Sequence, residues 1–195
     1  INDIPILEHW LLKLEQIGIE EVLVNTHYLS EKVEEFLKIR AKSNLKITQV
    51  YEKNLYGTAG TLIKNKSFFN KSNILFIHVD NYTTSDLSGL LEAFQNRPKK
   101  CLMTMLTFHT LDPKSCGVVK VDNQGIVKSF YEKVKNPPTN LANGAIYIFN
   151  YKLIDWILSK IPKCTDFSCD VIPLLINKIN LSLIHISEPT RRLAI

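Results

Sequence analysis

The sequence lacks several features that would define its class at once. Its four cysteines include no Cys-x-x-Cys pair, so a zinc ribbon or a dithiol redox site has little support. No apolar stretch reaches the length of about 18 residues that a membrane-spanning helix needs, and no signal peptide is recognisable. We therefore expect a cytoplasmic protein without a membrane partner.

Charge of one sign is not concentrated anywhere either. The formal net charge of +5 is spread along the 195 residues, and no long block of lysine and arginine marks a nucleic-acid-binding tract. No serine, histidine and aspartate arrangement and no pair of metal-ligating histidines stands out. We therefore expect no nucleic-acid partner, and phosphate handling by positioning and charge is the chemistry that fits.

The composition is that of one globular domain, with 45% hydrophobic and 22% charged residues. Apolar residues at helical spacing predict helices over residues 6–17, 30–37, 61–69, 85–94, 151–158 and 166–179, the last interrupted by Pro173. Runs rich in β-branched and aromatic residues predict strands over residues 20–25, 46–51, 73–80, 101–108, 117–121, 126–133 and 144–149.

This alternation predicts an α/β, Rossmann-like fold with an open, mixed and mainly parallel sheet flanked by helices. After Pro113 the pattern changes to a hairpin, so the second half should be more antiparallel. The almost continuous apolar run 73–80 predicts a central strand that is covered on both faces. Ligands in open α/β sheets bind beyond the carboxyl ends of the parallel strands, where Asp80 lies.

The ten residues YEKNLYGTAG, at positions 51–60, join a predicted strand to a predicted helix. Gly57 and Gly60 bracket Thr58 and Ala59, so the backbone can adopt tight geometry and a ligand can approach it closely. The spacing suits a nucleotide-binding turn, but glycine turns of this kind also occur without a ligand.

Four polar residues could carry chemistry. Asp80 ends the most apolar strand, where Mg²⁺ bridging the carboxylate to phosphate oxygens would be a good partner; a turn cap made with Asn81 is the alternative. Glu132 and Lys133 are neighbours, so at most one faces a given pocket unless the strand ends there. Asn143 precedes a strand and, taken alone, indicates a turn.

Three further side chains are expected to be structural. Cys101 lies in an apolar run and should be a small core residue. Ser30 is a candidate N-cap for the helix that follows it. His27 follows a strand and should bond to the backbone rather than line a cleft.

Several segments together resemble the sugar-1-phosphate nucleotidyltransferases, also called nucleotide-sugar pyrophosphorylases. They are YEKNLYGTAGTL, FIHVDN and the stretch from SCGVVKVDNQGIVKSFYEK through LANGAIYIF to DFSCDVIP. The pattern is closest to the branch of mannose-1-phosphate and heptose-1-phosphate guanylyltransferases, in which strings similar to NTHYL and LANGAIY occur. The resemblance covers the chain from about Ile1 to Ile179.

The resemblance implies a nucleotide site on the glycine turn. Gly57 and Thr58 would lie against the nucleobase and ribose of a nucleoside triphosphate, and Glu52 would read the edge of the base. A carboxylate only accepts hydrogen bonds, while guanine offers N–H donors at N1 and N2, so Glu52 favours GTP.

The resemblance also implies a catalytic and sugar-phosphate site. Asp80 would hold the Mg²⁺ that bridges the reacting phosphates, and Lys133 would neutralise the phosphate of a sugar-1-phosphate. Glu132 would accept hydrogen bonds from sugar hydroxyls, beside Gly117 and Asn143. The implied reaction is an in-line displacement at the α-phosphorus with pyrophosphate leaving, for surface polysaccharide synthesis, and without a covalent enzyme intermediate. The identity of the sugar is not readable, and a homo-oligomer is compatible with the family.

Both ends of the chain depart from the family pattern. Residues 1–180 are expected to form the nucleotidyltransferase domain without its N-terminal strand and its glycine-rich loop G-G-x-G-T-R-L, and hence to have little or no activity. A second metal-binding aspartate is also not found. Residues 181–195, LSLIHISEPTRRLAI, resemble a translated transposase adapter and are predicted to be a non-native tail. A native strand at the start of this tail is the alternative.

Two other functions remain open on this reading. A catalytically silent regulatory subunit that senses nucleotide sugars could be built on the same fold. A glycosyltransferase would need an Asp-x-Asp metal motif, and Asp80-Asn81-Tyr82 lacks the second aspartate.

Overall fold

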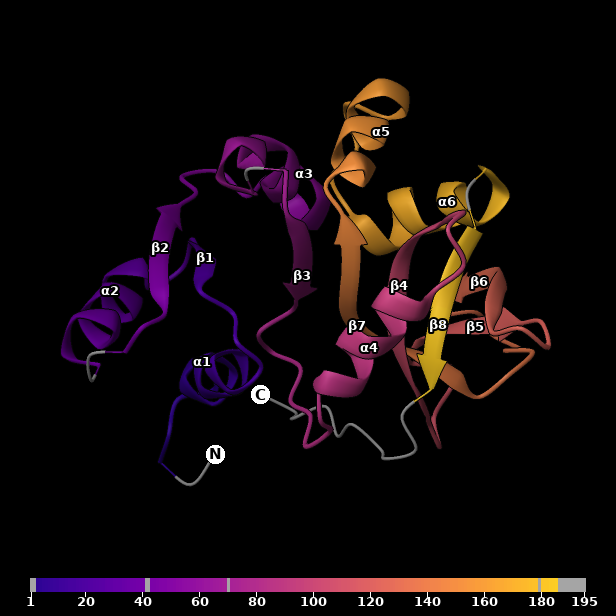
Figure 1. Ribbon diagram of the computed structural model, residues 1–195, viewed down its shortest axis with the longest axis horizontal. Coiled ribbons are helices and arrows are strands. Elements are labelled where there is room, and N and C mark those ends of the chain that lie inside the picture. The colour runs from indigo at the N-terminus through magenta and orange to yellow at the C-terminus, as the bar shows by residue number, and fades with distance from the viewer. Residues whose placement is uncertain (1–2, 41–42, 70, 179, 186–195) are drawn as a thin grey trace.

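The computed structural model describes residues 3–40, 43–69, 71–178 and 180–185 (Figure 1). Its helical elements are α1 (Ile6–Gln16), α2 (Ser30–Ile39), α3 (Gly57–Lys64), η1 (Lys66–Phe69), α4 (Ser88–Asn96), α5 (Lys152–Lys160), η2 (Phe167–Val171) and α6 (Ile172–Lys178). Its strands are β1 (Glu21–Thr26), β2 (Lys46–Tyr51), β3 (Asn73–Ile77), β4 (Cys101–His109), β5 (Gly117–Val121), β6 (Ile126–Glu132), β7 (Leu141–Asn150) and β8 (Asn180–His185). None of the described helices is long and apolar enough to cross a bilayer.

The described strands form two sheets. β1 and β2 pair in parallel, and the other six strands have the order β3-β7-β4-β8-β6-β5. In this larger sheet β4 and β8 are parallel, while the remaining described pairings are antiparallel. The predicted mixed α/β architecture with flanking helices is therefore confirmed, but parallel pairing does not dominate the larger sheet.

The position of β7 explains this difference. β7 lies between β3 and β4 and is antiparallel to both, so β3 and β4 are parallel to each other without being neighbours. The crossover from β3 through α4 to β4 is thus the expected βαβ unit, with a later strand inserted at its centre. Strand order along the chain does not reveal such an insertion.

β3 was expected to be central, but among the described strands it lies at an end of the larger sheet. Its two faces are covered as predicted, because Ile74 and Phe76 join one hydrophobic cluster while Leu75 and Ile77 join the other. Burial on both faces explains the continuous apolar run, which therefore does not report the position of a strand within its sheet.

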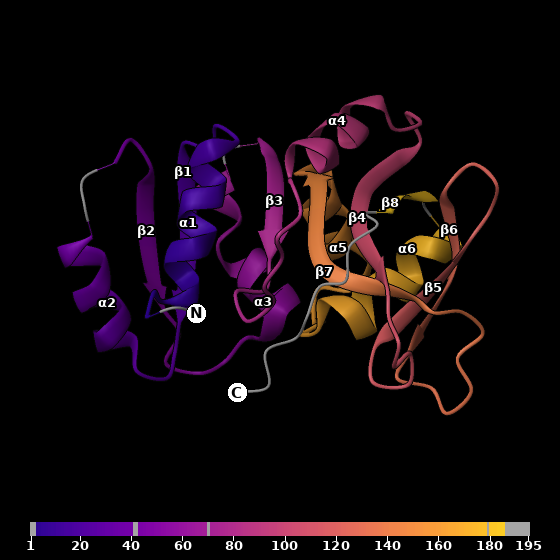
Figure 2. The same ribbon diagram turned by 90° about the horizontal axis from the view of Figure 1, so that it is seen from below.

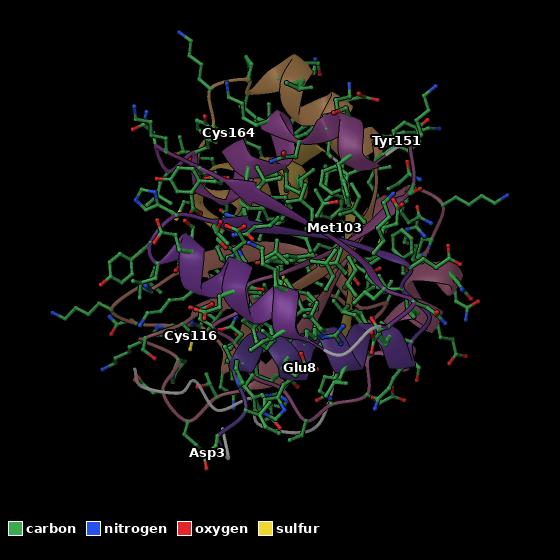
Figure 3. The ribbon with its side chains drawn as sticks, turned by 90° about the vertical axis from the view of Figure 1, so that its left-hand side faces the viewer. Asp3, Glu8, Met103, Cys116, Tyr151 and Cys164 are labelled. Atoms are coloured by element: carbon green, nitrogen blue, oxygen red, sulfur yellow. The ribbon has the colours of Figure 1, made fainter. Side chains whose placement is uncertain are left out.

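Helices cover both faces of the larger sheet. α1 and α4 pack on one face, and α3, α5, η2 and α6 pack on the other (Figures 1 and 2). Tyr147 and Phe149 of β7 face the second group, and Ile146 and Ile148 face the first. Figure 3 shows Met103 of β4 inside this core, where its side chain is 1% exposed. Period-two alternation thus fills two cores at once.

Two predicted details at helix starts are corrected. Ser30 is the first residue of α2, and Leu29 takes the N-cap position in the left-handed region, with φ of 52° and no side-chain cap bond. Pro173 is the second residue of α6 and does not interrupt that helix. The irregularity that proline was expected to cause precedes it, as the π-helical turn η2.

The segment predicted to be a non-native tail begins inside the sheet. Residues 180–185 form β8, which pairs with β4 and β6. The origin of residues 181–195 stays a prediction, and positions 186–195 lie outside the described residues.

Candidate active site

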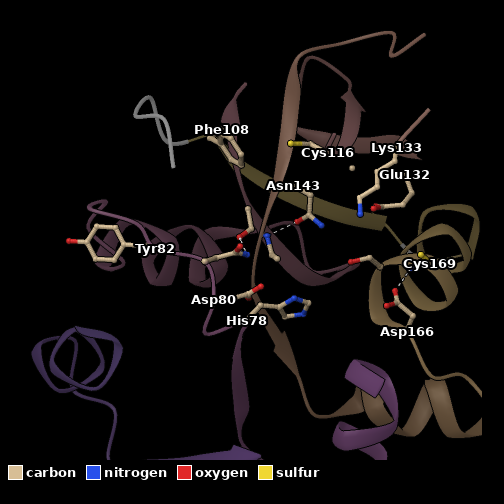
Figure 4. A pocket seen from close by; sticks show the side chains of 15 residues that line it. His78, Asp80, Tyr82, Phe108, Cys116, Glu132, Lys133, Asn143, Asp166 and Cys169 are labelled. Atoms are coloured by element: carbon tan, nitrogen blue, oxygen red, sulfur yellow. Dashed lines mark hydrogen bonds between the residues drawn. The ribbon is translucent and has the colours of Figure 1, made fainter. Parts of the chain in front are cut away.

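A cavity of about 260 Å³ opens beside the carboxyl end of β3. Its walls come from the loop after β3, the start of β5, the end of β6, the first half of β7 and the start of η2 (Figure 4). The cavity brings together five of the site residues predicted from the sequence, which are Asp80, Gly117, Glu132, Lys133 and Asn143.

The loop that carries Asp80 is held from two sides. The indole Nε1 of Trp10 donates to the carbonyl of Val79 at 3.1 Å and to that of Asn81 at 2.8 Å. The side chain of Asn81 donates to the carbonyl of Gly144 at 3.2 Å. Among the described residues the carboxylate of Asp80 makes no hydrogen bond or ion pair, so it does not act as a turn cap. It is exposed on the cavity wall and available to a ligand.

Glu132 and Lys133 both extend into the cavity (Figure 4). β6 ends at Glu132, and Lys133 adopts the left-handed region with φ of 47°. This backbone turn ends the alternation of a strand, which is why two neighbouring side chains share one cavity. A left-handed conformation costs a non-glycine residue about 1–2 kcal/mol, and such strain is often found at functional sites. Within the described part of the chain, Lys133 has no ion-pair partner.

Gly117 makes room for the carboxylate of Glu132. The two residues are paired across β5 and β6. A Cβ atom at position 117 would lie 2.5 Å from Oε2 of Glu132 and 2.7 Å from the ring of Phe130. The absence of a side chain at this position therefore sets where the carboxylate can lie.

Asn143 was expected to precede a strand, but it lies within β7, where a bulge directs it toward the cavity. The pairing of β4 with β7 shifts register between Met105 and Thr107, and Ala145 takes a left-handed φ of 52°. The amide of Asn143 is held at both ends, because Oδ1 accepts from the backbone N–H of Ala145 at 2.9 Å and Nδ2 donates to Oη of Tyr147 at 2.7 Å. Bulges commonly re-aim a side chain in this way.

The predicted glycine turn, residues 51–60, forms a separate cluster outside this cavity. Its residues 57–60 are the first turn of α3, which begins earlier than predicted. Glu52 is only 1% exposed, and its carboxylate accepts from Oγ1 of Thr61 at 2.5 Å and from the backbone N–H of Tyr56 at 3.2 Å. His27 donates from Nδ1 to the carbonyl of Glu52 at 2.7 Å, in keeping with the expected backbone bond. In this conformation Glu52 ties the start of α3 together, and its contact with a nucleobase stays a prediction.

Gly57 and Thr58 pack against the segment that precedes α6. Gly57 has φ of 75°, and a Cβ atom there would lie 2.4 Å from the carbonyl oxygen of Thr165. Oγ1 of Thr58 accepts from the backbone N–H of Phe167 at 2.7 Å. The close approach that the glycine permits is thus made by the protein's own backbone. Ser168, one residue further on, lines the cavity, so this segment connects the two clusters.

The sequence reasoning missed several residues in the cavity lining and one buried residue that is bonded to it. Tyr147 lies in an apolar strand and resembles core, yet its hydroxyl reaches Asn143; burial raises the pKa of this hydroxyl to about 12. Cys116 and Cys169 line the cavity, and burial, with the Asp166 carboxylate next, raises the pKa of the Cys169 thiol. No motif marks these cysteines, whereas Cys101 is fully buried as predicted.

The cavity can be tested for its fit to Mg²⁺. The described residues contain no group of three His, Cys, Asp or Glu side chains that could hold a metal ion by themselves. Mg²⁺ commonly takes one or two carboxylates and completes its octahedron with phosphate oxygens and water. The carboxylate of Asp80 faces the cavity without a protein partner, and Asp166 lines the same cavity. This donor set fits an ion that is held jointly with a phosphate ligand.

Comparison with known proteins identifies relatives along almost the whole chain. Residues 1–188 match the family described as "Nucleotidyl transferase". Mannose-1-phosphate guanylyltransferase of Mycobacterium tuberculosis is 27% identical over 175 residues, covering 89% of this chain and 47% of the relative. Mannose-1-phosphate guanylyltransferase catalytic subunit beta of Drosophila melanogaster is 31% identical over 156 residues, covering 78% and 42%. The chain thus spans less than half the length of these two relatives.

A solved structure has the same fold. HddC from Yersinia pseudotuberculosis, complexed with GMP-PN, matches with a TM-score of 0.76 at 19% identity, covering 93% of this chain and 76% of that chain. The family match extends over both clusters and over every strand of the two sheets. The chain therefore belongs to the nucleotidyl transferase family.

Proposed function

We propose that the chain provides the sugar-phosphate side of an enzyme that transfers a guanylyl group from GTP to a sugar 1-phosphate. The observation that carries this proposal is the cavity, in which an unpaired carboxylate at Asp80, an ammonium at Lys133 and an amide at Asn143 converge. Cation, hydrogen-bond donor and metal-binding carboxylate are the groups that a phosphorylated sugar requires.

Each side chain has a separate task in this reaction. Lys133 binds and neutralises the phosphate of the sugar 1-phosphate, and Glu132 accepts hydrogen bonds from sugar hydroxyls. The lack of a side chain at Gly117 leaves room for the Glu132 carboxylate. With the sugar phosphate held, its phosphate oxygen forms a bond to the α-phosphorus of GTP, and the bond from that phosphorus to pyrophosphate breaks. Mg²⁺ bound at Asp80 would supply charge neutralisation on the phosphoryl oxygens.

The choice of GTP rests on two kinds of support. The two relatives described above carry names that specify guanylyl transfer, and the matched structure was solved with GMP-PN. Glu52 stands in the turn that would hold the base, although its carboxylate is engaged within the protein. We place the reaction in the cytoplasm, in the synthesis of activated sugars for surface polysaccharides.

Calorimetric titration of the purified chain tests the proposal. With Mg²⁺ present, mannose 1-phosphate should bind, while mannose and inorganic phosphate should each bind at least about tenfold more weakly, because neither engages all the groups. Absence of binding by any sugar 1-phosphate in a panel that includes mannose, glucose and heptose derivatives would refute the proposal. Binding of intact GDP-mannose without binding of mannose 1-phosphate would instead indicate a sensing subunit.

The base preference is tested on the same protein. GTP, ATP, UTP, CTP and dTTP are compared by titration, and pyrophosphate release is followed with each sugar 1-phosphate. We expect guanine nucleotides to bind most tightly, with little or no turnover by this chain alone. A preference for dTTP would contradict the assignment of guanine.

A further inference from the structure

A chain of three hydrogen-bonding side chains lies in the wall of the cavity. Nδ2 of Asn143 and Oη of Tyr147 are 2.7 Å apart, and Oη of Tyr147 and Oγ of Ser168 are 3.4 Å apart. Asn143 and Ser168 both line the cavity, while Tyr147 is fully buried between them. Two cavity residues from β7 and η2 are thus joined through one hydroxyl.

Which atom donates in each of these hydrogen bonds follows from the neighbouring groups. The backbone N–H of Ala145 must donate, so the amide atom that it contacts is Oδ1 of Asn143, and the atom beside Tyr147 is Nδ2. An amide nitrogen only donates, and the hydroxyl of Tyr147 must therefore accept from it. A fully buried hydroxyl also needs an acceptor for its own hydrogen. Oγ of Ser168 is the acceptor at hand.

The two side chains at the ends of this hydrogen-bond series, Asn143 and Ser168, are consequently both donors. Once Oγ of Ser168 accepts from Tyr147, the hydroxyl hydrogen of Ser168 is free to bond a partner other than these three side chains. The second hydrogen on Nδ2 of Asn143 is left in the same way. The ammonium of Lys133 lies on the wall of the same cavity (Figure 4). Three positive or donating groups therefore surround one space.

We propose that Ser168 is a further contact residue for the sugar phosphate and that Tyr147 is a positioning residue that holds Asn143 and Ser168 as donors toward its oxygens. The inference rests on the proposed function, because it names residues of the same sugar-phosphate site. It assigns a role to two side chains that neither the sequence motifs nor the metal and charge arguments identify.

The hydroxyl of Tyr147 stays protonated, so its hydrogen bonds should be the same across the physiological pH range. Burial raises its pKa to about 12, although hydrogen bonds to Ser168 and Asn143 lower it, and the charges of Glu132 and Asp166 raise it further. The hydroxyl therefore keeps its hydrogen at neutral pH. Any contribution of Tyr147 to ligand binding should be unchanged between about pH 6 and pH 9.

The test begins with Tyr147→Phe, which keeps the packed ring and removes only the hydroxyl. We expect the affinity for mannose 1-phosphate to fall about five- to tenfold, by the loss of one positioned hydrogen bond. Tyr151→Phe is the matched control, because this ring packs against the same core and its hydroxyl makes no hydrogen bond with the described residues. That control should change the affinity less than about twofold.

A double-mutant cycle separates positioning from general loosening. If Tyr147 acts through Asn143 and Ser168, the Tyr147→Phe change should cost less than about twofold in a background that carries both Asn143→Ala and Ser168→Ala. Additive losses would overturn the positioning role. Ser168→Ala should weaken mannose 1-phosphate binding more than it weakens mannose binding, and equal effects on both ligands would overturn the phosphate-donor role of Ser168.

Nuclear magnetic resonance of the unliganded chain provides a measurement that needs no ligand. The side-chain amide signals of Asn143 should shift toward random-coil positions in Tyr147→Phe and stay in place in Tyr151→Phe. Unchanged Asn143 signals would overturn the inference even if affinity fell. If the wild-type chain bound no sugar phosphate while the amide signals shifted, the proposed function would have failed and the hydrogen-bond chain would stand as structure alone.

Discussion

The two polar clusters of this protein differ in where their hydrogen bonds go. In the glycine turn, Glu52 and Thr58 are bonded to other parts of the chain, and Gly57 is in contact with the Thr165 carbonyl. In the cavity, the side chains of Asp80 and Lys133 have no partner among the described residues. One N–H of the Asn143 amide is not used in its bond to Tyr147. The two clusters are adjacent, but only the second presents unused polar groups.

This difference separates architecture from recognition. A buried carboxylate that already accepts two hydrogen bonds stabilises the fold, and a ligand would have to displace those donors to use it. An unpaired charge on a cavity wall contributes little to folding and is available to a ligand. Substitutions in the glycine turn should therefore change stability first, and substitutions in the cavity should change binding first.

Gly57→Ala should give the largest effect. The new Cβ atom would lie 2.4 Å from a backbone oxygen, at a residue whose φ is 75°, so both clash and backbone strain oppose it. We expect the free energy of unfolding in urea to fall by about 3–4 kcal/mol. Gly18→Ala isolates the strain, because φ is 76° and nothing lies within 4 Å; its cost should be about 1–2 kcal/mol. Equal costs at the two positions would contradict the proposed clash with Thr165.

Glu52→Ala should be the second largest change. It removes the acceptor for the Thr61 hydroxyl and for the Tyr56 amide, so we expect a loss of about 2–3 kcal/mol in urea unfolding. Glu35→Ala, at an exposed position of α2, is the control and should stay within about 0.5 kcal/mol. If Glu52→Ala left stability intact and reduced guanine-nucleotide affinity instead, the claim that this cluster serves mainly the fold would be wrong.

Lys133→Gln should affect binding rather than folding. The ammonium is the cation that would face the phosphate, so the affinity for mannose 1-phosphate should fall about 10- to 100-fold, with unfolding changed by no more than about 0.5 kcal/mol. Lys135→Gln, two residues further along, carries the same change outside the cavity lining. A matching loss in both variants would show that net charge, and not the position of Lys133, is responsible.

Substitution of Asp122, in the β5–β6 turn, should have the smallest effect on stability. This carboxylate lies at the surface but is bonded within the protein, like Glu52. The ammonium of Lys128 and the backbone N–H groups of Ile126 and Gln124 lower its pKa to about 2. Because its pKa is lowered on folding, its stabilising contribution is present above its usual value of 3.8 and is lost as the pH falls toward 2. Urea unfolding should thus lose stability between pH 4 and pH 2 more steeply in the wild type than in Asp122→Asn. If stability fell equally steeply with pH in both proteins, the hydrogen bonds of Asp122 would not stabilise the fold.

Much of the fold follows from local pattern, but the sheet order does not. The helix over residues 6–17 and the strand over residues 46–51 are found almost where hydrophobic spacing predicts them. The insertion of β7 between β3 and β4 depends on its pairing with β3, between residues 69 to 77 positions apart, and with β4, between residues 32 to 46 positions apart. Apolar runs report burial on two faces and carry no information about which strands are neighbours.

The site was predictable where residues end strands. Glu132 is the last residue of β6 and Lys133 follows it, while Asp80, which was expected to end its strand, lies in the loop three residues after β3 ends at Ile77. All three line the cavity. The left-handed turn at Lys133 could not be foreseen, because lysine has no preference for that conformation. Tyr147 and Ser168 could not be foreseen either, since a tyrosine in a run such as GAIYIF is indistinguishable from core until its hydroxyl is placed.

The indole of Trp10 gives this protein an optical reporter of its own. Its N–H is bonded to the carbonyls on both sides of Asp80, while the ring is 3% exposed. The other tryptophan, Trp156, lies in α5 on the opposite face of the sheet and supplies a reference signal. Indole emission depends on the polarity and hydrogen bonding around the ring, so occupancy at Asp80 should be readable as a change in the fluorescence of Trp10, without any attached label.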